Sequence, residues 1–73
     1  MQLTYLFKTR SSAGGNCPAV YSTDSGELVV QGWNLDGGEE SQMRNVADNE
    51  TGVRIPYDLA EQIADMVISR RGQ

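Results

Sequence analysis

Few residues in this sequence have the chemistry of a catalytic or metal-binding group. The chain has 73 residues, with no histidine and a single cysteine, Cys17. Without an imidazole, neither a Ser-His-Asp nor a Cys-His nucleophile can form. A lone thiol cannot build a zinc site, and it excludes an intrachain disulfide. We therefore expect no cofactor and no enzymatic activity.

Cys17 could be either a reactive thiol or a buried apolar residue. It lies in the run Asn16-Cys17-Pro18, and a reactive thiolate needs a positive environment. No sequence neighbour supplies one, although the fold could bring Lys8 or Arg10 close. We interpret Cys17 as a small buried apolar residue. The alternative is a small enzyme or ligand carrier that uses Cys17 or the carboxylates, which requires a concave pocket with perturbed titrating groups.

Two other patterns resemble chemical motifs and have simpler interpretations. Adjacent residues on a helix do not face each other, so Glu39 and Glu40 are not a catalytic carboxylate pair. They suit the first turn of a helix, whose positive end favours acidic groups. Gly14-Gly15 and Gly37-Gly38 lack the spacing and the lysine of a phosphate-binding loop. We interpret these glycines as loop residues.

The charge balance disfavours nucleic acid as a direct partner. The net charge is −4, and the six Lys and Arg residues are scattered along the chain. Nucleic-acid binders instead present basic stripes that neutralise phosphates. An acidic chain suits a basic partner, which could itself be a DNA-binding protein.

The sequence also predicts where the protein acts. No segment approaches the ~20 apolar residues that a membrane span requires. The stretch from Met1 to Phe7 lacks the basic region and long apolar run of a signal peptide. A single free cysteine fits a reducing interior. We predict a cytoplasmic protein with no membrane partner.

The pattern of apolar residues and turns predicts a small α+β domain that spans residues 1–73. The Gly26 turn favours a hairpin, and Pro56 and Gly72 suit the start and stop of a helix. Leu3, Tyr5 and Phe7 would share one face of the first strand. We expect a twisted antiparallel sheet of three to four strands, a short helix, and a C-terminal helix packed on one face. The expected strands are 2–8, 19–22, 27–33 and 53–55, and the expected helices are 39–47 and 57–71.

The C-terminal helix carries more apolar surface than one sheet can cover. Its apolar residues span an arc of about 200°, whereas a helix on a single sheet needs about 100° or somewhat more. Tyr57, Ala64 and Ile68 lie on the flank of this arc. Either the chain's own sheet or loops cover the flank, or it contacts a second copy or another protein. The residues assigned to the core are Leu59, Ile63, Met66 and Val67.

Trp33 ends the third expected strand and has two interpretations. Large aromatic side chains stabilise small domains, which favours a place in the core. The alternative is an interface residue, and we include Trp33 among the candidate contact residues.

Three stretches together resemble small uncharacterised actinobacterial proteins with a domain of unknown function. The stretches are Ser11–Tyr21, with its Gly-Asn-Cys run, Gly26–Trp33 and Val53–Leu59. Such proteins are often encoded beside helix-turn-helix regulators. The resemblance implies a regulatory partner protein that binds or antagonises a helix-turn-helix repressor. It carries over no catalytic residue.

A second, local resemblance covers Val53–Glu61, which looks like the strand–Pro–helix step of swapped-hairpin DNA-binding antitoxins. It implies a DNA-binding dimer as the alternative function. That alternative requires Lys8, Arg10, Arg44 and Arg54 to converge on one face.

The function we predict is a non-catalytic, protein-binding regulatory module that modulates a helix-turn-helix transcription regulator. The partner is another protein or, through self-association, a second copy in a homodimer. The candidate contact residues are Tyr57, Ala64, Ile68 and Trp33.

Overall fold

Three antiparallel strands form the main sheet, in the order β1-β2-β3. They are β1 (Leu3–Lys8), β2 (Ala19–Thr23) and β3 (Leu28–Gln31). The structure is a computed structural model that describes residues 1–11 and 17–72. The Gly14-Gly15 pair, interpreted above as loop glycines, lies outside the described residues.

The predicted hairpin between β2 and β3 is confirmed. Gly26 has a φ of +88°, in the left-handed region that favours glycine. The Thr23 N–H donates to the Glu27 carbonyl at 2.9 Å, and the Thr23 hydroxyl accepts from the Glu27 N–H at 2.9 Å. The turn is therefore closed by both the backbone and the side chain of Thr23.

A β-bulge in β1 interrupts the alternation of side chains that the sequence predicts. Tyr5 pairs with Tyr21, whereas Phe7 pairs with the adjacent residue Val20, and the register shifts between them. Neighbouring residues of β2 point to opposite faces of the sheet, so Phe7 lies on the face opposite to Tyr5. The expectation that Leu3, Tyr5 and Phe7 share one face is wrong, because the extra residue re-aims Phe7.

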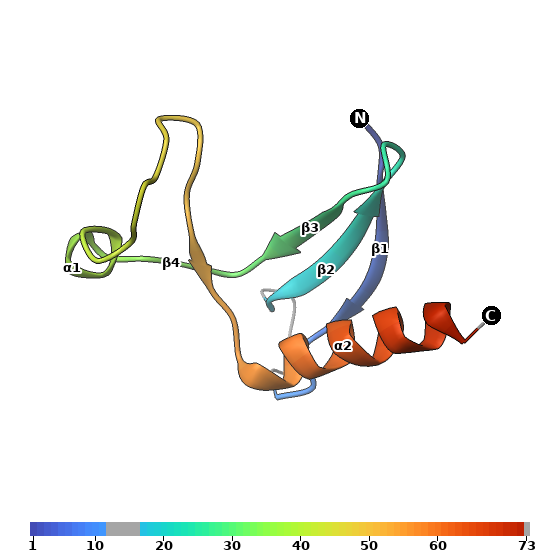
Figure 1. Cartoon of the computed structure of the whole chain (residues 1–73). Coiled ribbons are helices and arrows are strands. Elements are labelled where there is room, and N and C mark those ends of the chain that lie inside the picture. The colour runs from blue at the N-terminus through green and yellow to red at the C-terminus, as the bar shows by residue number, and fades with distance from the viewer. Residues whose placement is uncertain (12–16, 73) are drawn as a thin grey trace.

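Residues 33–54 form an arm that extends away from the main sheet (Figure 1). The arm contains β4 (Trp33–Asn34), α1 (Gly37–Glu40) and β5 (Val53–Arg54), and β4 pairs with β5 in a separate two-stranded sheet. The expected strand 27–33 is thus two strands that part at Gly32. A Cβ at Gly32 would lie 2.5 Å from the Arg54 carbonyl oxygen. Only glycine allows the two backbones to approach so closely.

The short helix is displaced from its expected position at 39–47. It begins at Gly37 because Asp36 forms a capping box, in which its carboxylate accepts from the Glu39 N–H at 2.8 Å. Gly37 and Gly38, interpreted above as loop glycines, are its first turn. The helix ends at Glu40, and Asn45 has a φ of 55°, which a right-handed helix cannot accommodate.

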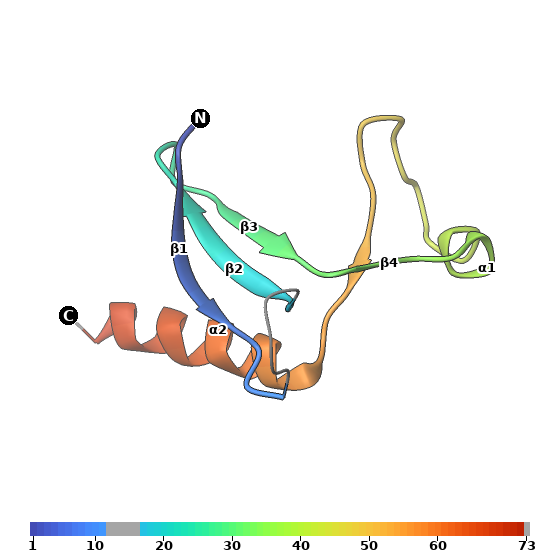
Figure 2. The same ribbon diagram turned by 180° about the vertical axis from the view of Figure 1, so that it is seen from behind.

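The long helix α2 (Tyr57–Arg71) has the bounds that the sequence predicts. It lies on one face of the main sheet (Figure 1 and Figure 2). Leu59 is a residue of this helix, and its side chain is fully buried. Val67, assigned above to the core, is 39% exposed. Among the described residues, the buried apolar core is Cys17, Ala19, Val20 and Leu59.

A polar junction fixes the first turn of α2 against the end of β1. The Thr9 hydroxyl is buried and donates to Asp58 Oδ1 at 2.5 Å, while the Arg10 N–H donates to Asp58 Oδ2 at 2.9 Å. These two hydrogen bonds, the one from Thr9 first, lower the pKa of Asp58 from its usual 3.8. Gln62 Nε2 also donates to the Lys8 carbonyl at 3.0 Å. The junction holds α2 at its N-terminal end.

Candidate functional site

An exposed apolar strip runs along the side of α2 that faces away from the sheet. At about 100° per residue, its members fall within an arc of about 100°. We call this strip the helix flank; it consists of Tyr57, Ala60, Ala64, Val67 and Ile68. All five are exposed, with Tyr57 at 89% and Ile68 at 64%. The described parts of the chain therefore leave the flank uncovered.

The flank has an acidic border along one side. Glu61 and Asp65 are exposed and follow Tyr57 and Ile68 around the helix. Arg70 and Arg71 stand at the C-terminal end, where they match the negative end of the helix dipole. The surface therefore suits an apolar groove with basic groups beside it.

Trp33 lies on the arm, and its assignment to the core is wrong. Its side chain is 43% exposed, because the chain leaves the main sheet at Gly32. The Arg54 guanidinium lies over the indole ring, 5.9 Å from its centroid. The candidate contact residues thus fall on two elements, with Trp33 on β4 and Tyr57, Ala64 and Ile68 on α2.

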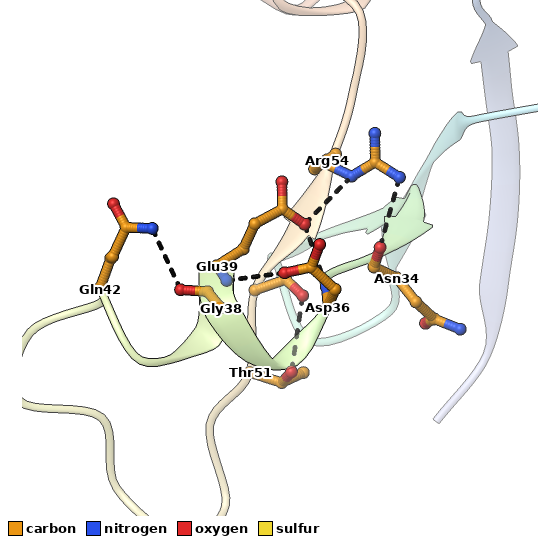
Figure 3. A network of polar contacts seen from close by, with 8 residues as sticks. Asn34, Asp36, Gly38, Glu39, Gln42, Thr51 and Arg54 are labelled. Atoms are coloured by element: carbon orange, nitrogen blue, oxygen red, sulfur yellow. Dashed lines mark hydrogen bonds and ion pairs between the residues drawn. The ribbon is translucent and has the colours of Figure 1, made fainter.

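A polar network around Arg54 stabilises the arm (Figure 3). Arg54 Nε lies 3.6 Å from Glu39 Oε1, and Arg54 Nη2 donates to the Asn34 carbonyl at 3.5 Å. The same Glu39 oxygen accepts from the Asp36 N–H at 3.0 Å. Glu39 therefore acts as a capping and pairing residue, which confirms its predicted place in a first helical turn. The arm is also closely packed at Gly52, where a Cβ would lie 2.8 Å from Met43 Sδ.

Between α2 and the main sheet lies a groove of about 350 Å³ that the sequence analysis missed. It opens along the C-terminal half of α2, where Met66 and Arg70 face Leu6 and Leu28. The polar junction lies at the other, N-terminal end of α2. The existence of the groove depends on the angle between helix and sheet, for which the sequence carries no local signal.

Cys17 is buried, which confirms its interpretation as a small buried residue. Within residues 1–11 and 17–72, no group of three or more His, Cys, Asp or Glu side chains could hold a metal ion. No helix in this described part is long and apolar enough to cross a membrane. The chain matches no protein-family model, no curated protein and no solved structure.

Proposed function

We propose that the protein is a non-catalytic, protein-binding regulatory module that docks its helix flank on a helix-turn-helix transcription regulator in the cytoplasm. The observation that carries the proposal is the exposure of an apolar strip from Tyr57 to Ile68 on a 15-residue helix, with Arg71 following in the same arc at the C-terminal end. Amphipathic helices dock such strips in apolar grooves of partner proteins. The resemblance to proteins encoded beside helix-turn-helix regulators supports this class of partner.

The charges favour a basic partner. The chain carries a net charge of −4, and Glu61 and Asp65 border the flank. Complementary charges steer association and select the partner, while the buried apolar side chains supply most of the affinity. A DNA-binding regulator has basic surface for phosphates. An acidic module that occupies or borders that surface competes with DNA, which is a direct route to regulation.

The test is a calorimetric titration, with the wild-type chain and two variants, of a candidate helix-turn-helix regulator chosen from the neighbouring genes. Ile68 is 64% exposed, so its burial contributes about 1–2 kcal/mol and Ile68→Ser weakens binding about 5- to 30-fold. Val46→Ser is the matched control, because Val46 is exposed at 44% but lies on the arm. It should bind like the wild type.

The outcomes test the proposed function and the proposed binding surface separately. If the regulator does not bind the wild-type chain, the proposed function is rejected. Binding that Val46→Ser weakens as much as Ile68→Ser would reject the helix flank as the surface. Raising the salt concentration should weaken wild-type binding, since charge steering is screened.

The alternative, an antitoxin-like DNA-binding dimer, is favoured by one observation. The strand–Pro–helix step is present as β5, Pro56 and α2. Against it, Arg54 is engaged by Glu39 and lies over Trp33, and the net charge is negative. A gel shift with DNA from upstream of the gene decides, because direct binding would fall steeply with salt.

A further inference from the structure

The groove between α2 and the main sheet combines an apolar floor with two charged side chains. Its volume is about 350 Å³, at the small end of the range of about 300–1,000 Å³ that ligand pockets occupy. Leu6 and Leu28 line it from the sheet, and Met66 lines it from α2. None of the three is fully buried, and Leu28 is 41% exposed. The floor therefore offers apolar surface that a small ligand can cover.

The two charged residues of the lining are one cation and one anion. Arg70 belongs to the last turn of α2, and Glu27 follows the turn of the β2–β3 hairpin. In the part of the chain that the structure describes, the one ion pair joins Arg54 to Glu39, so Arg70 and Glu27 do not pair with each other. The Glu27 carboxylate accepts a hydrogen bond from the Ser25 hydroxyl at 3.0 Å instead. Opposite charges thus line one groove with a gap between them.

Both charged residues project from ordered backbone. The Thr23 N–H donates to the Glu27 carbonyl, and the Thr23 hydroxyl accepts from the Glu27 N–H, each at 2.9 Å. Arg70 is one helical turn from Met66, so the same face of α2 supplies the cation and part of the apolar floor. A ligand that binds here orders side chains and leaves the backbone as it is, which lowers the entropic cost of binding.

The charge pair selects the class of ligand. An uncharged apolar molecule would take water from Arg70 and Glu27 and give neither a partner. A simple carboxylate would pair with Arg70 and meet a like charge at Glu27, and a simple amine would meet a like charge at Arg70. A molecule that carries a carboxylate and an ammonium on one carbon atom pairs with both residues. An α-amino acid has this arrangement, and an apolar side chain on it matches the floor.

We propose that the groove between α2 and the main sheet binds a free α-amino acid with an apolar side chain. The Arg70 guanidinium donates to the ligand carboxylate, and the Glu27 carboxylate accepts from the ligand ammonium. The ligand side chain lies against Leu6, Leu28 and Met66. Because the groove is open to water, we expect a dissociation constant of about 0.1–5 mM. The site goes beyond the proposed function, since it lies on the side of α2 that faces the sheet, away from the helix flank.

The first test is an NMR titration of the isotope-labelled full chain with L-leucine and with L-methionine. Both should shift the backbone amide signals of Leu6, Leu28 and Met66 and reach saturation. Isocaproate has the leucine side chain and carboxylate without the ammonium, and isoamylamine has the side chain and ammonium without the carboxylate. Each lacks one charge-assisted contact and should bind about fivefold or more weakly than leucine.

The second test repeats the leucine titration with two pairs of matched variants. Arg70→Gln should weaken binding about fivefold or more, whereas Arg71→Gln removes the same charge from a residue outside the groove lining and should bind like the wild type. Glu27→Gln should also weaken binding, and Glu40→Gln on α1 is its control. Arg70 and Glu27 are exposed, so both variants should fold, and circular dichroism checks this.

Three results would overturn the proposal. The first is the absence of saturable shifts with both amino acids. The second is isocaproate or isoamylamine binding as tightly as leucine, and the third is equal weakening by Arg70→Gln and Arg71→Gln. If Glu27→Gln does not fold, isocaproate tests the same contact on the wild-type chain. These titrations need no partner protein, so their failure leaves the proposed function standing, and failure of regulator binding leaves the amino-acid site standing.

Discussion

Replacing Leu59 by alanine tests how α2 is held on the sheet. Leu59 is fully buried, whereas the other apolar residues of α2 are partly or largely exposed. Large-to-small substitutions of a buried leucine cost about 2–5 kcal/mol, which combines the lost transfer energy and the cavity. A chain of 73 residues has a total free energy of unfolding of about 4–11 kcal/mol. Leu59→Ala should therefore remove about half of the stability.

Val67→Ala is the matched control for Leu59→Ala. It truncates an aliphatic side chain of the same helix that is 39% exposed, so it should cost less than about 1 kcal/mol. The assay is urea unfolding followed by circular dichroism, at one fixed protein concentration so that self-association cannot alter the comparison of apparent stabilities. In a thermal scan, Leu59→Ala should lower Tm by about 10 °C or more. Equal costs for the two variants would refute the argument that Leu59 is the residue that anchors the helix.

Two further predictions concern the arm and the polar junction. Gly32→Ala would place a Cβ 2.5 Å from the Arg54 carbonyl oxygen, so β4 must move away from β5 and the environment of Trp33 must change; the intrinsic fluorescence of Trp33 should shift, and an unchanged spectrum would contradict the close approach. The pKa of Asp58 is lowered in the folded state, chiefly by the hydrogen bond from Thr9, so its contribution to stability is complete above pH 3.8 and is lost as the pH falls through the lower folded value. Unfolding midpoints from pH 6 to pH 2 should therefore fall more steeply in this acid range for the wild type than for Asp58→Asn, and parallel curves would show that Asp58 makes no such contribution.

Elements defined by local signals were predicted well. The bounds of α2 follow from Pro56, which caps its start, and Gly72, which follows its last residue. The β2–β3 hairpin follows from Gly26, which adopts the left-handed conformation that the turn needs. Both depend on residues that are close in sequence, so the sequence predicts them directly.

Features that depend on contacts distant in sequence were not predicted. The place of Trp33 is decided by Gly32, which packs against the backbone of Arg54, 22 residues further along the chain. The short helix cannot extend to its expected end at residue 47, because Asn45 has a positive φ that has no marker in a pattern of apolar residues. For the candidate site, helical periodicity placed Tyr57, Ala64 and Ile68 together on one flank of α2, and the structure shows that all three are exposed. For β1, the alternation of side chains placed Phe7 on the face of Leu3 and Tyr5, which is wrong because the bulge separates Phe7 from Tyr5.

The same bulge sets how the length of this chain can vary. Removing Leu6 would delete the extra residue of the bulge, so that Tyr5 and Phe7 become neighbours, keep Tyr21 and Val20 as partners and still point to opposite faces. Removing a residue elsewhere in β1 would instead exchange the two faces for part of the strand, which a point substitution cannot do. The exposed stretch 44–51 at the end of the arm pairs with no strand of the main sheet and has no such constraint. Insertions, tags and spectroscopic labels therefore belong in that stretch, whereas a single-residue deletion in β1 at a position other than Leu6 should be among the least tolerated changes.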